Sequence, residues 1–591
     1  MLAMKLSFIV MVLVVFTLFI FVNKVAFITL SIEKLKTKIT MMQNSFLAII
    51  EQSIRNNWER TALTEFHSRT ILYKDFAREI DQLHVFFGQA GVKKGDKISI
   101  CGKNSANWAI SFFAILSYGA VAVTILHEFD KKSVQFIVDH SDSIMFFVDQ
   151  KIWERVDETT LPNLKTVISL DNYSLLKSDT DSLKQFVEGS KKYFEEKYKP
   201  GFFVNDFLFR TDEPEELAVI NYTSGTTSSP KGVMIPYRSL YSNTKYANEN
   251  VGFMNSGDGI LCMLPMAHAY GLAFEILNSI SLGCNVYFLD KLPSPNVLLE
   301  ALKIVKPKLV LAVPLILEKI VTKNVFPKLK KSSAKYLIKI PIVNSVVHKK
   351  VRNSMIEFFG GNLVEVVVGG AALNPEVENF LKKIKFPFTV GYGMTETGPL
   401  ISYAYWSDYK KRSSGKVVDR MCAKIDSEDP ENVVGEILVK GENLMLGYYK
   451  SEEATKDALT EDDWFKTGDL GTLDGDNFIF IKGRNKNLIL GPSGQNIYPE
   501  EIEERLNASM YVSESLAIDE NKKIIALIVP DFDALKQEMI PESKFDLLFK
   551  QIVDDVNLNL PTFSQIASFR IQEEEFVKTP KRSIKRFLYQ K

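Results

Sequence analysis

The most constraining feature of the sequence is a loop rich in hydroxyl side chains, residues 221–233 (NYTSGTTSSPKGV), which directly follows an apolar run. The run, residues 217–220, predicts a short buried strand. Small hydroxyl residues and a glycine leave backbone N–H groups accessible, and a lysine adds positive charge, so the loop suits a cluster of phosphate oxygens. It is not a Walker A loop, because the spacing from Gly225 to Lys231 is wrong and no Ser or Thr follows the lysine. The alternative is a polar turn before a strand. The candidate phosphate ligands are Thr223, Ser224, Gly225, Thr226, Thr227 and Lys231.

Length and composition indicate a large protein of ordinary globular character. A chain of 591 residues exceeds what one hydrophobic core supports, so at least two domains are expected. Hydrophobic residues make up 46% and charged residues 24% of the chain, a typical globular balance. Lys+Arg and Asp+Glu both number 72, so net charge does not indicate a nucleic-acid partner. The 4 cysteines include no CxxC pair and the 6 histidines show no metal-ligand spacing, which favours packing cysteines in a reducing compartment.

The N-terminal segment is apolar and has two interpretations. Residues 6–22 carry no charge, and the apolar character continues to residue 30, near the length of a membrane-spanning helix. Lysines are more frequent after this segment than before it, which would place the rest of the chain in the cytoplasm, anchored to the inner face of the cell membrane. A signal peptide is disfavoured, because no small-residue cleavage site follows. In the second interpretation residues 1–40 are upstream sequence that is not always translated, since Met41 and Met42 precede the first amphipathic segment.

Beyond residue 44 the pattern alternates between helix and strand. Residues 73–90 predict an amphipathic helix whose apolar face is Phe76, Ala77, Ile80, Leu83 and Phe87. Further strands are predicted at residues 97–101, 119–126, 259–264, 286–289 and 309–313, and further helices at residues 108–118, 272–282 and 297–305. This alternation predicts an α/β fold with parallel sheets covered on both faces. The more polar residues 151–216 are expected to be surface excursions. The basic residues 328–350 predict a solvated helical face or, alternatively, a membrane-surface patch.

Short motifs with glycines, single acids and basic residues are spread over the rest of the chain. They are residues 264–271 (LPMAHAYG), 366–373 (VVVGGAAL), 391–397 (GYGMTET), 464–469 (WFKTGD), 483–489 (GRNKNLI), 491–503 (GPSGQNIYPEEIE) and 578–586 (KTPKRSIKR). Taken singly, most have a plain structural interpretation. His268 would be a satisfied core histidine, Asp469 and Arg484 a surface ion pair, and the last motif a solvated basic tail.

Taken together and in this order, the motifs resemble those of the adenylate-forming superfamily, which includes acyl-CoA synthetases, luciferases and peptide-synthetase adenylation domains. The resemblance covers roughly residues 45–591, and residues 494–503 are most similar to bacterial long-chain fatty acid–CoA ligases. It implies a large N-terminal α/β domain with parallel sheets and a β-barrel-like part, and a small mobile α+β C-terminal lid. The expected boundaries are residues 1–40 for the hydrophobic segment, 41–485 for the large domain and 486–591 for the lid.

The resemblance also implies roles for particular residues. The nucleotide would be bound at the adenine by Gly369, Gly370, Ala371, Tyr392 and Gly393, at phosphate by Thr395, and at the ribose by Asp469 and Arg484. Glu396 would hold Mg²⁺ together with Thr226 or Thr227. His268 would border the acyl and thiol channel, the loop glycines Gly491 and Gly494 would line the tunnel of the thiol acceptor, and Lys486 would be the hinge.

Two positions depart from the family pattern. Ser228 stands where the family usually has glycine, which predicts altered loop flexibility rather than loss of function. Ser583 stands where the family has the lysine that bridges the carboxylate and the α-phosphate in the transition state. Lys581 or Lys585 would have to reach into the site instead.

The activity implied is the ATP-dependent conversion of a fatty acid to an acyl-adenylate, followed by transfer to a thiol. The expected catalytic residues are Lys231, Thr226, Glu396, Lys581 and Lys585, and the expected cofactors are ATP, Mg²⁺ and coenzyme A as co-substrate. A long-chain acid would suit a protein with a membrane anchor. Acyl carrier protein is an alternative acceptor, because it presents the same thiol arm. Ser583 motivates a further alternative, a non-catalytic nucleotide- and lipid-binding relative.

Overall fold

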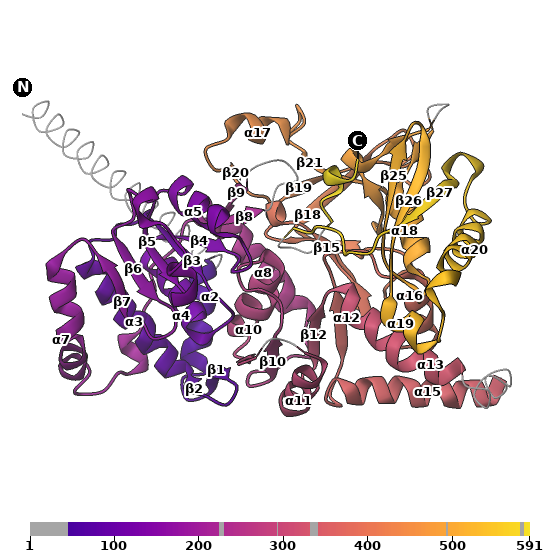
Figure 1. Cartoon of the computed structure of the whole chain (residues 1–591). Coiled ribbons are helices and arrows are strands. Elements are labelled where there is room, and N and C mark those ends of the chain that lie inside the picture. Colours follow the sequence, from indigo (N-terminus) through magenta and orange to yellow (C-terminus); the bar gives the residue numbers. More distant parts are fainter. Residues whose placement is uncertain are drawn as a thin grey trace, which may run out of the picture.

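The structure, a computed structural model, describes residues 45–223, 230–291, 294–330, 341–491, 495–579 and 584–590. Figure 1 shows a large body, coloured indigo to orange, and a smaller C-terminal body in yellow beside it. The predicted α/β class is confirmed by sheets that contain parallel strands and by helices that pack on them. The apolar residues 6–30 lie outside the described residues. Within the ranges given above, no helix combines the length and apolarity needed to cross a membrane.

The largest sheet has eight strands in the order β20-β9-β8-β4-β3-β5-β6-β7. Its five central strands, from β8 to β6, are parallel, and antiparallel strands complete both edges. The strands are β3 (Lys97–Cys101), β4 (Val121–Ile125), β5 (Ser143–Val148), β6 (Thr166–Ser169), β7 (Leu175–Ser178), β8 (Leu217–Thr223), β9 (Lys231–Pro236) and β20 (Gly447–Tyr448). Strand β8 therefore ends where the hydroxyl-rich loop begins, and β9 begins at the lysine that closes it.

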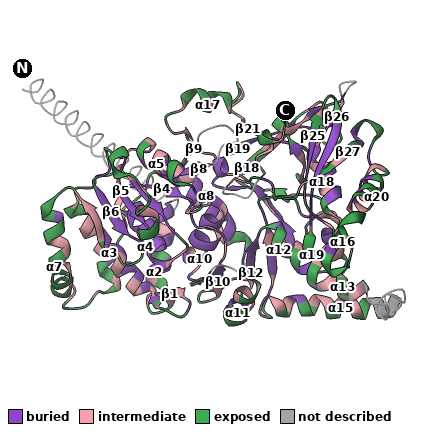
Figure 2. Ribbon diagram, viewed as in Figure 1, coloured by how far each residue is buried: buried purple, intermediate pink, exposed green. Residues whose placement is uncertain are grey.

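Helices pack on both faces of this sheet, as the alternating pattern predicts. Helix α3 (Tyr73–Gln89) buries the five residues expected for its apolar face. Helix α4 (Ala106–Tyr118) is buried at every residue except the last, because it packs between β3 and β4 on one side and β1 and α3 on the other. A helix enclosed in this way has no solvent face, which explains its almost uniformly apolar sequence. Figure 2 shows the central strands of this sheet buried and the outer helix α7 (Asp181–Lys197) largely exposed.

Two further sheets are mainly parallel and lead toward the C-terminal body. One has the order β10-β11-β1-β2 and the other the order β12-β13-β14. Their strands are β1 (Thr61–Glu65), β2 (Thr70–Leu72), β10 (Gly259–Cys262), β11 (Asn285–Phe288), β12 (Leu309–Ala312), β13 (Glu365–Val368) and β14 (Phe388–Val390). The glycine motif follows directly after β13, and Tyr392 follows shortly after β14. Carboxyl ends of parallel strands are the usual place for ligands in α/β folds.

The remaining strands of the large body form small antiparallel sheets. One has the order β15-β16-β17 and the other the order β18-β19-β21-β22. Their strands are β15 (Tyr392–Gly393), β16 (Leu400–Tyr403), β17 (Lys416–Val417), β18 (Met421–Asp426), β19 (Gly435–Gly441), β21 (Phe465–Leu473) and β22 (Ile479–Arg484). A single bridge between Lys416 and Phe478 links the two sheets. The part expected to be barrel-like is thus made of open sheets, and the described strands close no barrel.

The C-terminal body has its own hydrophobic core. Its sheet has the order β25-β26-β27, and the helices α18 (Pro499–Asn507) and α20 (Phe545–Asn557) pack on it. Its strands are β25 (Val512–Glu520), β26 (Lys523–Pro530) and β27 (Ile566–Ile571). The core includes Leu506, Ala526 and Phe549 and is separate from the clusters of the large body. This is the α+β C-terminal domain that the resemblance implies.

The prediction for residues 151–216 was wrong in part. Strand β6 pairs in parallel with β5, all four of its residues are buried, and β7 extends the sheet by one further strand. The rest of the segment includes α7, of which only Leu183 is buried. Because β6 is short and contains Thr and Ser, its pattern in the sequence does not distinguish it from a polar loop.

Candidate active site

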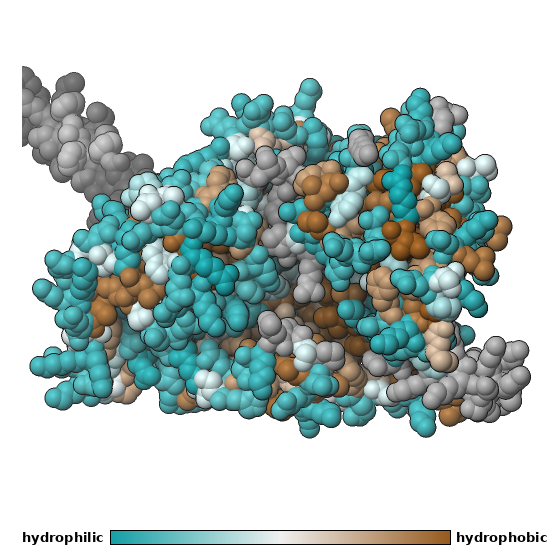
Figure 3. All heavy atoms as spheres, in the orientation of Figure 1, coloured by the Kyte–Doolittle hydropathy of each residue, from teal (hydrophilic) through white to brown (hydrophobic). Residues whose placement is uncertain are grey.

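A cavity of about 2470 Å³ lies between the large body and the C-terminal domain. Figure 3 shows a hollow in the middle of the molecule whose floor is hydrophobic. Most of the predicted site residues that the structure describes line this cavity. They are Thr223, Lys231, His268, Gly369, Gly370, Ala371, Tyr392, Gly393, Thr395, Glu396, Asp469, Arg484, Lys486 and Lys585. Groups that are far apart in the sequence therefore open onto one space.

The other predicted residues are not brought into this arrangement. Gly491 is described, but it is not among the residues that line the cavity. The remaining predictions lie outside the described residues: Ser224, Gly225, Thr226, Thr227, Gly494 and Lys581. Their roles, and that of Gly491, stay predictions, and the same holds for Ser228 and Ser583.

A buried carboxylate, Asp469, lies at one end of the cavity. The register of β21 and β22 pairs Asp469 with Arg484, whose Nε lies 2.9 Å from Oδ1. The hydroxyl of Tyr392 donates to Oδ2 at 2.8 Å. Burial raises the pKa of Asp469, and both Arg484 and Tyr392 act against this rise. The Arg484 side chain is half exposed, but the carboxylate of Asp469 is buried, so the pair keeps an acceptor with two oxygens inside the cavity, where it suits the hydroxyls of a sugar.

Glycine occupies the positions at the floor of the cavity for different structural reasons. A Cβ added to Gly369 would come 3.1 Å from the Tyr270 ring, and Gly370 has φ +89° with open space beside it. At Gly393, by contrast, a Cβ would lie 1.9 Å from the carbonyl oxygen of Pro399. Gly393 is thus required by packing of the chain itself, whereas Gly370 combines a left-handed backbone with a bare surface that a flat ring can approach.

Glu396 and Lys231 lie at the part of the cavity next to the hydroxyl-rich loop. Glu396 belongs to the 3-10 turn Thr395–Thr397 and is buried, and its Oε1 accepts a hydrogen bond from the hydroxyl of Tyr448 at 3.0 Å. The ammonium of Lys231 lies 5.1 Å from the centroid of the same tyrosine ring. Tyr448 belongs to none of the motifs quoted above. Only the pairing of β20 with β9 reveals it.

The carboxylate of Glu396 fits a magnesium site of the kind that a nucleotide completes. Mg²⁺ is usually bound by one or two carboxylates together with phosphates and water. The described part of the chain contains no cluster of three His, Cys, Asp or Glu side chains, so a dedicated all-protein cage is not present there. Thr226, the second predicted ligand, lies outside the described residues.

Lys486, predicted as the hinge, also faces the cavity. It belongs to the 3-10 turn Asn485–Asn487 that follows β22. Burial lowers the pKa of Lys486, as do Arg484 and Lys231, while Asp469 and Glu396 raise it. The lysine is therefore within electrostatic reach of all four groups. Its role as the hinge stays a prediction.

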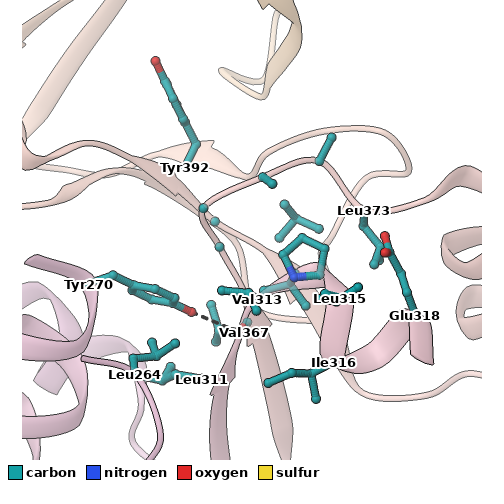
Figure 4. Close-up of a pocket in the computed structure, with 18 of the residues that line it drawn as sticks. Leu264, Tyr270, Leu311, Val313, Leu315, Ile316, Glu318, Val367, Leu373 and Tyr392 are labelled. Carbon is teal, nitrogen blue, oxygen red and sulfur yellow. Dashed lines mark hydrogen bonds between the residues drawn. The ribbon is translucent and has the colours of Figure 1, made fainter. Parts of the chain in front are cut away.

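An apolar branch of the cavity extends from the glycine floor. The hydroxyl of Tyr270 donates to the backbone oxygen of Val367 at 3.0 Å, and the imidazole Nδ1 of His268 accepts the N–H of Tyr270 at 3.2 Å. Figure 4 shows Tyr270 among apolar side chains, with Tyr392 pointing away from them. The branch is lined by Leu264, Leu298, Leu311, Val313, Ile316, Met355, Phe358 and Val367, among others. The cavity thus joins a polar end to an apolar one.

The C-terminal segment closes part of the same cavity. Ile584, Lys585 and Arg586 line it, and the N–H of Lys585 donates to the carbonyl oxygen of Val577 at 2.8 Å. The guanidinium of Arg586 is held by the carboxylate of Glu503. Burial raises the pKa of Glu503 to about 7, and the charge of Arg586 opposes this rise. These contacts fix the segment so that Lys585 faces the cavity.

A buried carboxylate, a bare glycine floor and basic groups around one cavity of a two-domain α/β protein are typical of a nucleotide-binding site. Comparison with known families agrees. Residues 50–449 match the model of the AMP-binding enzymes, and residues 486–591 match the model of the AMP-binding enzyme C-terminal domain. The chain therefore belongs to the AMP-binding enzyme family. It is an enzyme of the AMP-forming acyl-CoA ligase type, and the resemblance inferred from the motifs is confirmed.

Similar proteins act on different acids. A long-chain-fatty-acid–CoA ligase of Mycobacterium bovis is 27% identical over 475 residues, which cover 76% of this chain and 75% of that protein. The structure of o-succinylbenzoate CoA synthetase from Bacillus subtilis with its acyl-adenylate has a TM-score of 0.70 at 22% identity, covering 92% of this chain and 97% of that one. An anthranilate CoA ligase bound to anthranoyl-AMP has a TM-score of 0.73 at 20% identity, covering 92% and 96%.

Proposed function

We propose that the protein is a long-chain fatty acid–CoA ligase. It joins a fatty carboxylate to the AMP portion of ATP, releases pyrophosphate, and then transfers the acyl group to the thiol of coenzyme A. The observation that carries this proposal is the continuity of the cavity, in which the polar end at Lys231, Glu396 and Asp469 leads into the apolar branch beside Tyr270.

The dimensions and lining of the cavity support a long apolar acid. Pockets for ligands of drug size usually measure about 300–1,000 Å³. The cavity of about 2470 Å³ has room for a nucleotide and a second, extended molecule. Aliphatic and aromatic side chains dominate the branch, and burial of an alkyl chain there contributes about 0.8 kcal/mol for each methylene group. The named fatty-acid ligase among the relatives supports the same substrate class.

The first step needs a carboxylate and a triphosphate held together at the polar end. A carboxylate oxygen attacks the α-phosphorus, a P–O bond forms, and the bond to the pyrophosphate group breaks. In this proposal Lys231 and Arg484 stabilise the negative charge, and Asp469 holds the ribose. Glu396, with Thr226, would hold Mg²⁺, which would neutralise phosphate charge. No nucleophilic side chain is required, because the substrate itself attacks.

Ser583 stands at the position of the family's catalytic lysine, and we propose that Lys585 supplies the missing positive charge. Lys585 stands two positions after Ser583 in the sequence, and it lines the cavity. Replacing Lys585 with alanine should slow pyrophosphate release by about tenfold to a hundredfold, because a positive charge near the reacting phosphate is lost. The rate is measured with ATP and a fatty acid under saturating conditions. Conversion of supplied acyl-adenylate to thioester should keep its wild-type rate.

The control for this prediction is Lys578→Ala. Lys578 is a lysine of the same segment that pairs with Glu514 and Glu575 and does not line the cavity. It should leave pyrophosphate release unchanged. If Lys585→Ala releases pyrophosphate at the wild-type rate while Lys581→Ala does not, the assignment passes to Lys581.

In the second step the thiol attacks the acyl carbon, and AMP leaves with the electrons of the acyl–oxygen bond. We propose that the C-terminal domain, residues 486–591, turns about Lys486 between the two steps, and that the loop with Gly491 and Gly494 then borders the thiol. In the structure Gly491 does not line the cavity while Lys585 does. This is the orientation expected for the first step.

A panel of acids tests the substrate class. Acyl-adenylate and thioester are followed by mass, with fatty acids of graded chain length beside o-succinylbenzoate and anthranilate. Long-chain acids should give thioester with the highest kcat/KM. A clear preference for an aromatic acid would refute the proposal.

The acceptor is tested by comparing coenzyme A with holo acyl carrier protein. A higher kcat/KM with the carrier protein would show that the carrier protein, and not coenzyme A, is the preferred acceptor. Nucleotide binding without release of pyrophosphate from ATP, whichever acid is supplied, would favour a non-catalytic relative.

A further inference from the structure

Tyr448 lies between the two oppositely charged side chains of the polar end. Its hydroxyl donates to Oε1 of Glu396 at 3.0 Å, and its ring centroid lies 5.1 Å from Nζ of Lys231. The tyrosine thus contacts both charged groups.

The fold places Tyr448 here through the edge of the largest sheet. Strand β20 pairs with β9 in antiparallel register, with Tyr448 opposite Val233. Residues two apart in a strand share a face, so Lys231 is the diagonal neighbour of Tyr448 on one face of the sheet. The N–H of Tyr448 donates to Oγ1 of Thr455 at 2.9 Å, which ties the strand to α17 (Glu452–Asp457). Figure 1 shows β20 and β9 together beneath α17.

A backbone contact just before β20 couples this segment to the acidic turn. The N–H of Met445 donates to the carbonyl oxygen of Glu396 at 2.9 Å. The segment that carries Tyr448 therefore holds both the backbone and the carboxylate of Glu396. A tyrosine hydroxyl has an ordinary pKa of about 10, so it is a hydrogen-bond donor at neutral pH.

We propose that Tyr448 is a positioning residue for the metal–phosphate site: its hydroxyl orients the carboxylate of Glu396 toward a divalent cation, and its ring holds the ammonium of Lys231 toward phosphate. This assignment rests on the proposed function, because it takes the nucleotide and its cation as the ligands. Hydrogen bonds to a metal-binding carboxylate fix its orientation and are costly to lose.

Neighbouring Tyr449 offers a matched control. It is the next residue, so its side chain lies on the opposite face, where its hydroxyl donates to Asp142 at 2.9 Å. Tyr449→Phe also removes one hydroxyl and one hydrogen bond to a carboxylate, but away from the cavity. It reports any general effect of loosening this edge of the sheet.

The experiment measures binding of Mn²⁺ in the presence of ATP by electron paramagnetic resonance, and binding of ATP without metal by calorimetry. Tyr448→Phe, which keeps the ring, should weaken Mn²⁺ binding about tenfold and leave metal-free ATP binding unchanged. Tyr448→Leu, which also removes the ring, should in addition weaken metal-free ATP binding about two- to fivefold, as expected for a lost cation–π contact. The half-saturating Mg²⁺ concentration for pyrophosphate release should rise in both variants.

Wild-type Mn²⁺ affinity in Tyr448→Phe would overturn the proposal, and so would an equal loss in Tyr449→Phe. Thermal unfolding of each variant checks that the domain is folded, and Tyr448→Phe, which adds no cavity, serves if Tyr448→Leu does not fold. Neither binding measurement requires a fatty acid substrate. A wild-type protein that binds Mn²⁺ and ATP but ligates no fatty acid would therefore refute the proposed function and leave this assignment standing.

Discussion

Asp469 illustrates how a single acidic side chain is kept available inside the protein. It is almost fully buried, which disfavours the charged form, but it has a positive partner in Arg484 and a donor in Tyr392. Hydrogen bonds that involve a charged group are about twice as strong as neutral ones. The three side chains therefore form a fixed acceptor that a ligand need not reorganise.

Replacing Asp469 with asparagine should weaken ATP binding about tenfold or more, because charge-assisted hydrogen bonds contribute about 1.5–3 kcal/mol each. The dissociation constant is measured by calorimetry. Asp474→Asn is the matched control: Asp474 follows the same strand but pairs with Lys410 and does not line the cavity. Unchanged ATP affinity in Asp469→Asn would show that this acid does not contact the nucleotide.

At the scale of elements, the π-helix Leu272–Leu277 contains a buried acid that the mechanism does not use. Glu275 is fully buried and accepts the N–H groups of Met263 and Leu264 at 3.2 and 2.9 Å. Burial raises the pKa of Glu275 to about 8, although the two N–H groups oppose this rise. The acid thus ties the π-helix to the segment that leads from β10 to His268.

This acid should make stability depend on pH. A glutamate in the unfolded chain has a pKa of about 4.3, so between about pH 4.3 and 8 the folded protein holds a proton that the unfolded chain has released. Stability from Glu275 is therefore complete below this window and is lost as pH rises through it, by up to about 1.4 kcal/mol per pH unit. The free energy of unfolding is measured by urea denaturation between about pH 5 and about pH 8, within that window. It should fall less steeply with rising pH in Glu275→Gln than in the wild type.

Other buried acids, such as Glu365 with a pKa of about 7, also lower stability as the pH rises, and they do so equally in the wild type and in Glu275→Gln. The difference between the two slopes therefore isolates Glu275. Identical slopes would show that its carboxyl group does not take up a proton on folding.

At the scale of the whole molecule, Arg412 joins the two bodies. Its guanidinium lies 2.6 Å from Oε1 of Glu504 on α18. The backbone N–H of Arg412 donates to the buried carboxylate of Glu378 at 2.6 Å. A weaker contact across the same interface joins Lys323 and Asp531 at 3.5 Å. Both contacts join the large body to the C-terminal domain, so they contribute to the orientation of one relative to the other.

Removing the side chain in Arg412→Ala should loosen this orientation. Exposed ion pairs contribute about 0.2–1 kcal/mol, so pyrophosphate release should fall about fivefold at most, while thioester formation from supplied acyl-adenylate should not slow. The two half-reactions are assayed separately, and small-angle scattering should show a wider spread of domain orientations. Arg420→Ala is the control, since Arg420 pairs with Glu249 inside the large body. An equal loss in both half-reactions would contradict a role in orientation.

The sequence predicted those elements whose periodicity is strong. The apolar face predicted for residues 73–90 is the one that α3 buries, and residues 97–101 form β3 as expected. Strand β6 was missed because it is short and has polar residues at both ends, and its burial depends on its pairing with β5 and β7. Likewise, the helix predicted at residues 272–282 begins as a π-helix, which periodicity does not distinguish from an α-helix.

The motifs alone determined the family and the chemistry that its cavity serves, because backbone access, a bare glycine surface and a few charges are properties that short segments carry by themselves. Only the tertiary structure decided how these groups are held. The partners of Glu396 and Asp469, and the side of the sheet on which Tyr448 lies, depend on the register of strands that are far apart in the chain. Register is set by the packing of the whole sheet, and no local pattern encodes it.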